Sequence, residues 1–132
     1  MDGKNLNFTY RNKHSEEQKN KSKECDRLFV YGTLQHRQSR NYILKELTFQ
    51  KAILSGYRKI SLSHLGFPII IPDKKSKVKG EVYFGLDNSL FQEIDIIEGE
   101  GSLYHRFLVN VETLEGERLL AFVYCPSQSL ID

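Results

Sequence analysis

The chain has 132 residues, of which 39% are apolar, and it carries a formal net charge of +2. This length predicts one domain with a single core, and so small a charge argues against nucleic acid as the main partner. No apolar run reaches the roughly 20 residues that a membrane helix needs, and the polar N-terminus is unlike a signal peptide. We therefore expect a cytoplasmic protein with no membrane partner.

The cysteines and histidines do not predict a metal site. Cys25 and Cys125 stand far apart in the sequence, and the histidines lack the spacing of metal ligands. A disulfide between the two cysteines stays open. The sequence also lacks a phosphate-binding loop, a dinucleotide fingerprint and a nucleophile elbow. We predict no metal and no cofactor.

Residues 1–26 differ in composition from the rest of the chain. Polar residues dominate there, and six basic side chains nearly balance five acidic ones. Such a segment buries too little apolar surface to offset the entropy that ordering would cost. We predict a flexible or loosely docked extension over 1–26 and a folded domain over 27–132. A role of the extension as a binding arm stays open.

The folded part is predicted to begin with a buried strand at 27–31, followed by a short helix at 37–47. Alternating apolar residues predict one or two strands over 49–62. Prolines bracket the apolar run 66–72, which favours an edge strand or an irregular strand. The charged residues at 73–79 then predict a solvated loop.

The second half of the folded part is predicted to contain further strands and one helix. Residues 78–86 alternate well, and Gly80 and Gly85 indicate bulges or a close approach of another backbone. A helix is predicted over 89–98, because Ser89 and Gln92 form a capping-box pair and Gly99 is a natural stop.

Two further strands, 104–111 and 117–124, are joined by Thr113-Leu114-Glu115-Gly116 and predict a hairpin. The sequence contains no internal repeat. These elements together predict an α+β domain in which a small mixed sheet curls into a barrel flanked by short helices.

Glu98 closes the predicted helix and is the candidate acid/base. The core-facing stripe consists of Leu90, Ile94 and Ile97, with Glu98 at its border and Asp95 on the far side of Phe91. Partial burial, the negative end of the helix dipole and the charge of Asp95 should all raise the pKa of Glu98. A nearby Arg106 would lower that pKa again. A plain surface carboxylate is the alternative interpretation.

The run Tyr31-Gly32-Thr33-Leu34 closes the first strand. A strand that ends on Gly-Thr turns sharply and leaves backbone N–H groups able to bind a small anion or a carbonyl oxygen. The alternative is a hairpin-like turn after an edge strand. Tyr104 and Arg106 alternate along a later strand, so they share one face. They either line a pocket or form an exposed face with Arg106 lying over Tyr104.

In their order along the chain, several short motifs resemble the γ-glutamylcyclotransferase-like family, and more closely its AIG2-like and γ-glutamylamine cyclotransferase branch. The resemblance covers roughly residues 27–126. The motifs are Phe29-Val30-Tyr31-Gly32-Thr33-Leu34, Gly66-Phe67-Pro68, Lys79-Gly80-Glu81-Val82-Tyr83, Ile94-Asp95-Ile96-Ile97-Glu98-Gly99, Tyr104-His105-Arg106 and Ala121-Phe122-Val123-Tyr124.

The resemblance implies a compact barrel with a cavity at its mouth and a small-molecule γ-glutamyl substrate. It implies that the amides of the Tyr31–Leu34 run hold the glutamyl group and that Glu98 is the acid/base. The implied reaction releases 5-oxoproline and an amine, by intramolecular aminolysis and without a cofactor. Two departures stand out: Gln35-His36-Arg37 is bulkier than the glycine that many relatives carry there, and Glu100 offers a second carboxylate.

We therefore expect a cyclotransferase in which Glu98 is catalytic. Tyr31, Gly32, Thr33 and Leu34 bind substrate, while Tyr104 and Arg106 shape or charge the pocket. One alternative is a non-catalytic module on the same barrel that binds a small metabolite. Another is an interaction domain that uses the extension and Lys74-Lys75-Ser76-Lys77 to contact an acidic partner. The leaving amine and the oligomeric state stay open.

Overall fold

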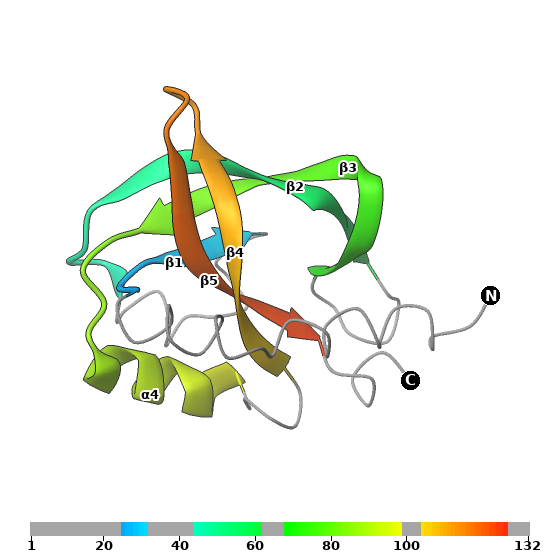
Figure 1. Cartoon of the computed structure of the whole chain (residues 1–132). Helices are drawn as coiled ribbons and strands as arrows, with labels where there is room; N and C mark the ends of the chain where they lie inside the picture. Colours follow the sequence, from blue (N-terminus) through cyan, green and yellow to red (C-terminus); the bar gives the residue numbers. More distant parts are fainter. Residues whose placement is uncertain (1–24, 32–43, 62–67, 99–103, 127–132) are drawn as a thin grey trace.

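The computed structural model describes residues 25–31, 44–61, 68–98 and 104–126. Five strands form a closed barrel in the order β1-β3-β2-β4-β5, and one helix packs on its outside (Figure 1). The elements are β1 (Leu28–Tyr31), β2 (Phe49–Ser61), β3 (Pro68–Tyr83), α4 (Asn88–Glu98), β4 (Tyr104–Thr113) and β5 (Arg118–Pro126). Because β1 and β5 are parallel while the other pairs are antiparallel, the predicted mixed barrel is confirmed.

Two apolar clusters hold the fold together. The interior cluster fills the barrel and includes Phe29, Leu54, Tyr57, Phe107, Val123 and Cys125. The helix-side cluster lies between the barrel and α4 and includes Leu28, Val30, Phe91, Ile94, Tyr104 and Phe122. Because successive residues of a strand point to opposite faces, β1 and β5 contribute to both clusters. Coverage on both faces explains why these strands are nearly continuous apolar runs.

The chain over 68–83 is one strand of 16 residues, so the predicted loop at 73–79 is wrong. The register moves from the pair Ser55↔Lys77 to the pair Tyr57↔Pro72, which leaves residues 73–76 bulged opposite Gly56. Asp73 accepts hydrogen bonds from the Lys75 amide at 3.1 Å and the Ser76 hydroxyl at 2.9 Å. These bonds lower the pKa of Asp73. The charged composition belongs to a bulge that bends β3.

Gly80 confirms the predicted close approach of a second backbone. A Cβ atom at this position would overlap the carbonyl oxygen of Val30 and come within 2.7 Å of Phe29 Cζ. Gly80 is paired with Tyr31, the last residue of β1. The missing side chain therefore lets β1 lie against β3 at the point where β1 ends.

The helix is confirmed with a start one residue earlier than predicted, at Asn88. Its N-cap is Asp87, whose Oδ1 accepts a hydrogen bond from the Leu90 amide at 2.9 Å. The predicted cap at Ser89 is therefore wrong. Most of the helix predicted over 37–47 lies outside the described residues.

The β4–β5 hairpin is confirmed. The Gly116 amide donates to the carbonyl of Thr113 at 2.9 Å, and Gly116 has a positive φ of 94°. This is the geometry of a three-residue hairpin loop with glycine in the left-handed region.

Candidate functional site

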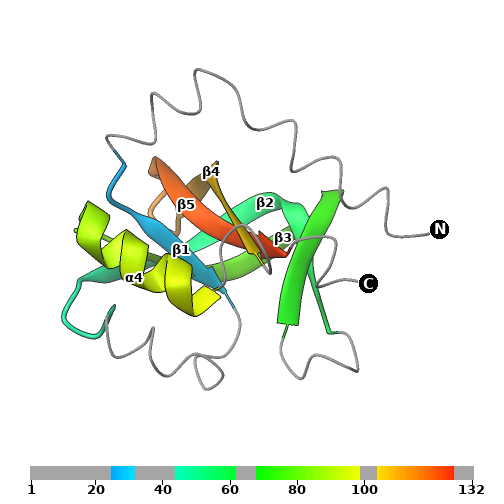
Figure 2. The same cartoon turned by 90° about the horizontal axis from the view of Figure 1, so that it is seen from below.

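Four chain segments meet at one end of the barrel. β1 and α4 run in the same direction in both views, and β1 ends at Tyr31 while α4 ends at Glu98 (Figures 1 and 2). β4 begins at that end and β5 finishes there, because Tyr104 pairs with Pro126. We call this the shared end of the molecule.

A network of polar side chains links α4 to the barrel near the shared end. Asp95 Oδ1 lies 2.9 Å from Arg106 Nε, and Arg106 Nη2 donates to Asp95 Oδ2 at 3.1 Å. The Tyr124 hydroxyl also donates to Asp95 Oδ1, at 2.6 Å. Both charged side chains are about three-quarters buried, with 24% and 23% exposed. Partial burial and paired geometry make this ion pair stronger than one on an open surface.

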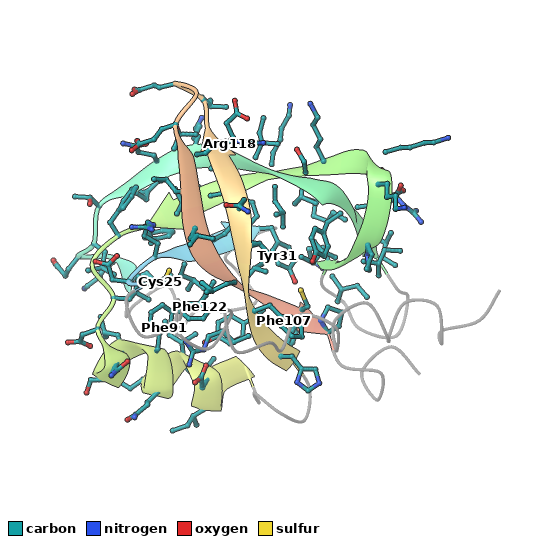
Figure 3. The ribbon with its side chains drawn as sticks, in the orientation of Figure 1. Cys25, Tyr31, Phe91, Phe107, Arg118 and Phe122 are labelled. Carbon is teal, nitrogen blue, oxygen red and sulfur yellow. The ribbon has the colours of Figure 1, made fainter. Side chains whose placement is uncertain are left out.

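Two aromatic rings hold the guanidinium of Arg106. Its Cζ lies 4.6 Å from the ring centroid of Phe91 on α4 and 4.4 Å from that of Phe122 on β5. The two rings meet edge to face with their centroids 5.0 Å apart. Figure 3 labels both residues between α4 and the barrel. A planar guanidinium can stack on rings and pair with a carboxylate at once, which a lysine ammonium cannot do equally well.

Tyr124 also connects the network to β1. The side chain of Tyr31 packs against the interior cluster, and Figure 3 shows it inside the barrel. Its hydroxyl donates to the backbone carbonyl of Tyr124 at 3.0 Å. One residue of β5 therefore binds the last residue of β1 through its carbonyl and the helix carboxylate through its hydroxyl.

The structure brings some of the predicted site residues together. Tyr104 is buried in the helix-side cluster, and Arg106 contacts Phe91 of that cluster, so the two side chains share the face toward α4. The alternative of an exposed face is wrong. Gly32, Thr33 and Leu34 lie outside the described residues, as does the side chain of Glu98. The assigned roles of these residues stay predictions.

Sequence reasoning missed Asp95 and Tyr124 as members of this site. Asp95 follows Phe91 by four residues, so it shares the face of Phe91 instead of lying on its far side. Phe91 is only 3% exposed, which places that face against the barrel. The helical spacing therefore contained the signal for Asp95. The partnership with Tyr124 depends on strand register, in which Arg106 pairs with Tyr124.

The described residues also line two grooves away from this network. Two open grooves of about 250 Å³ and 190 Å³ flank the β4–β5 turn, and both are lined by Thr113 and Leu114 rather than by predicted site residues. Over the described ranges, no three histidine, cysteine or carboxylate side chains gather as metal ligands. The helix in this part of the chain is too short to cross a membrane.

Residues 28–131 match the family described as "Gamma-glutamyl cyclotransferase, AIG2-like". Among curated proteins, the chain is 29% identical to AIG2-like protein A of Arabidopsis thaliana over 91 residues, which are 68% of this chain and 54% of that protein. It is 32% identical to the gamma-glutamylcyclotransferase family protein YtfP of Escherichia coli over 84 residues, covering 63% of this chain and 71% of the relative.

The chain spans about half the length of the plant relatives that it matches. Among solved structures, an AIG2-like protein from Mus musculus superposes with a TM-score of 0.65 at 24% identity, covering 78% of each chain. At that identity the likeness is one of fold. The closed barrel with its packed helix is therefore shared with this group of proteins.

Proposed function

Because the chain belongs to the AIG2-like gamma-glutamyl cyclotransferase family, we propose that it converts a γ-glutamyl amine or γ-glutamyl amino acid into 5-oxoproline and the free amine. The observation that carries this proposal is the common end of β1 and α4. The strand that leads into Gly32-Thr33-Leu34 and the helix that closes with Glu98 finish at the same end of the barrel.

The reaction suits a site with one carboxylate and a set of fixed donors. The α-amine of the γ-glutamyl group attacks its own γ-carbonyl, so nucleophile and electrophile are already joined and need only the correct orientation. Glu98 takes a proton from the α-ammonium, the ring C–N bond forms, and the C–N bond to the leaving amine breaks. Glu98 then returns its proton to the leaving nitrogen. The ring nitrogen gives up a second proton as it becomes an amide, and the released amine takes up this proton and leaves as an ammonium.

The residues after Tyr31 would supply the remaining interactions. Negative charge develops on the γ-oxygen during attack, and backbone N–H groups of Gly32, Thr33 and Leu34 would stabilise it. Tyr104 would form part of the wall, since it is buried beside α4. Because Asp95 balances the charge of Arg106, we assign Arg106 a role in shaping the site.

Release of 5-oxoproline tests the proposal. The protein should be incubated with γ-glutamyl dipeptides and with γ-glutamyl-lysine, and the product measured by mass spectrometry. We expect product from at least one of these substrates, and loss of turnover by a factor of about 100 or more in Glu98→Gln. Glu100→Gln is the matched control, and it should keep its activity.

The outcomes separate the proposal from its rivals. Full activity in Glu98→Gln, or loss of activity in Glu100→Gln instead, would reject the role of Glu98. Binding of a γ-glutamyl compound without release of 5-oxoproline would favour a non-catalytic module. Neither substitution should alter the fold, so the circular dichroism spectrum of each variant should match that of the wild type.

A further inference from the structure

We propose that Asp95, Arg106 and Tyr124 are positioning residues that hold the end of α4, and with it Glu98, against the exit of β1. This inference rests on the proposed function, because it says how the two halves of that site are held in register. It concerns side chains that contact each other and not the substrate.

Asp95 is well placed to hold the helix end. It precedes Glu98 by three residues, so it lies about 4.5 Å earlier along the helix axis, within the last turn. The last turn of any helix frays easily, because its carbonyls lack partners within the helix. In α4 no basic residue supports that turn, and Ile96 is 81% exposed. Burial of Ile94 and the bonds of Asp95 attach this turn to the barrel.

Tyr124 extends this attachment to β1. β1 pairs with β5 at Leu28↔Phe122, three residues before β1 ends. The bond from the Tyr31 hydroxyl to the Tyr124 carbonyl ties the end of β1 to β5 beyond that pair. A displacement of Tyr124 would therefore move the strand exit and the helix end relative to each other. The end of β1 and the last turn of α4 are therefore both hydrogen-bonded to Tyr124.

The stacking of Arg106 makes the support rigid. Arg106 extends from β4. Its guanidinium contacts a ring of α4 and a ring of β5, and it pairs with Asp95 of α4. One side chain thus contacts α4 and β5, and β5 is the strand to which the end of β1 is hydrogen-bonded. Small errors of position matter greatly here, because a misplacement of about 1 Å can reduce a rate by a factor of about 100.

Kinetics of single variants test the inference. Asp95→Asn keeps the size of the side chain but removes its charge, and Tyr124→Phe removes only the hydroxyl that binds Asp95. On a γ-glutamyl substrate turned over by the wild type, we expect kcat to fall by a factor of about 10 to 100 in each variant, with KM changed by less than about threefold.

Two control variants change α4 and its cap without touching the network. Glu93→Gln removes an exposed carboxylate of α4, and Asp87→Ala removes the N-cap. Both should keep kcat within about twofold of the wild type, although Asp87→Ala lowers the melting temperature. If Asp95→Asn and Tyr124→Phe lower kcat no more than Asp87→Ala does, the network is only structural and the inference is wrong.

Amide hydrogen exchange gives a readout that does not need turnover. In Asp95→Asn the amides of Ile96, Ile97 and Glu98 should exchange at least about tenfold faster, while those in the first turn of α4 are unchanged. Asp87→Ala should show the opposite pattern. If the Asp95→Asn substitution changes the exchange rates equally along the whole of α4, the inference is wrong. Absence of turnover in the wild type would instead reject the proposed function, and the exchange data would still decide the positioning role.

Discussion

Gly80 has its position because β1 and β3 approach closely there. A methyl group would meet the Val30 carbonyl and the ring of Phe29, both of which are buried in the barrel wall. Gly80→Ala should therefore lower the free energy of unfolding by about 2 kcal/mol, the usual cost of overpacking. Urea denaturation measures this loss.

Gly116→Ala is the comparison for Gly80→Ala. A methyl group at Gly116 would meet no atom within 4 Å beyond its chain neighbours, so its cost comes from the positive φ alone. That cost is about 1 kcal/mol. If Gly80→Ala proves no more destabilising than Gly116→Ala, the close approach of β1 and β3 is not as described.

Tyr57 gives the barrel a dependence on alkaline pH. Burial, and to a smaller extent the nearby Cys125, raises the pKa of the Tyr57 phenol above its usual value. A raised pKa in the folded state means that the stability is complete below the unfolded pKa of about 10 and is lost as the pH rises beyond it.

The variant Tyr57→Phe removes this dependence. Between pH 8 and pH 11 the wild type should lose about 1 kcal/mol of stability relative to Tyr57→Phe, measured by urea denaturation at both values. Lysine side chains titrate equally in both proteins, so the difference isolates Tyr57. An equal loss in the two proteins would mean that the phenol ionises freely in the fold.

At the scale of elements, the Asp87 side chain caps the start of α4. The Leu90 amide donates to Asp87, so Asp87→Ala should cost about 1 kcal/mol of stability. Ser89→Ala, which the sequence pattern predicts to be equally costly, should change the stability by less than about 0.5 kcal/mol. Thermal denaturation of the two variants checks the assignment, and a larger loss in Ser89→Ala would return the cap to Ser89.

The elements also show what the sequence can and cannot predict. The barrel, the helix and the hairpin follow from apolar alternation and from turn residues such as Gly116. The strand through Asp73–Ser76 does not, because a bulge of charged residues has the composition of a loop. Likewise, the sequence predicts Arg106 as a site residue, and helical spacing puts Asp95 on the face of Phe91. That Asp95 and Arg106 form an ion pair becomes evident only when α4 is packed against β4 and β5. Local patterns predict elements, whereas partners depend on register.

At the scale of the whole molecule, the chain just before β1 is bound to the barrel. The Leu86 amide donates to the Asp26 carbonyl at 2.9 Å, and the Phe122 amide donates to that of Arg27 at 2.9 Å. Residues 1–24 lie outside the described part, and the predicted extension over 1–26 stays a prediction. The backbone hydrogen bonds of Asp26 and Arg27 indicate that the chain is bound to the barrel from Asp26 onward.

Removal of residues 2–24 should therefore leave the barrel intact. We expect the urea midpoint of the truncated protein to match that of the full chain, since both keep the anchoring bonds of Asp26 and Arg27. A control that also removes residues 25–27 should be clearly less stable. A lower midpoint after removal of 2–24 alone would show that the extension is part of the fold.

The central claim is that the exit of β1 and the end of α4 form one site. Titration of the isotope-labelled protein with 5-oxoproline, followed by NMR of the backbone amides, tests it most directly. We predict that the amides of Gly32, Thr33 and Leu34 and that of Glu98 shift together, with one common dissociation constant. Shifts confined to the grooves around Thr113 and Leu114 at the hairpin turn, or shifts at only one of the two predicted segments, would contradict the account.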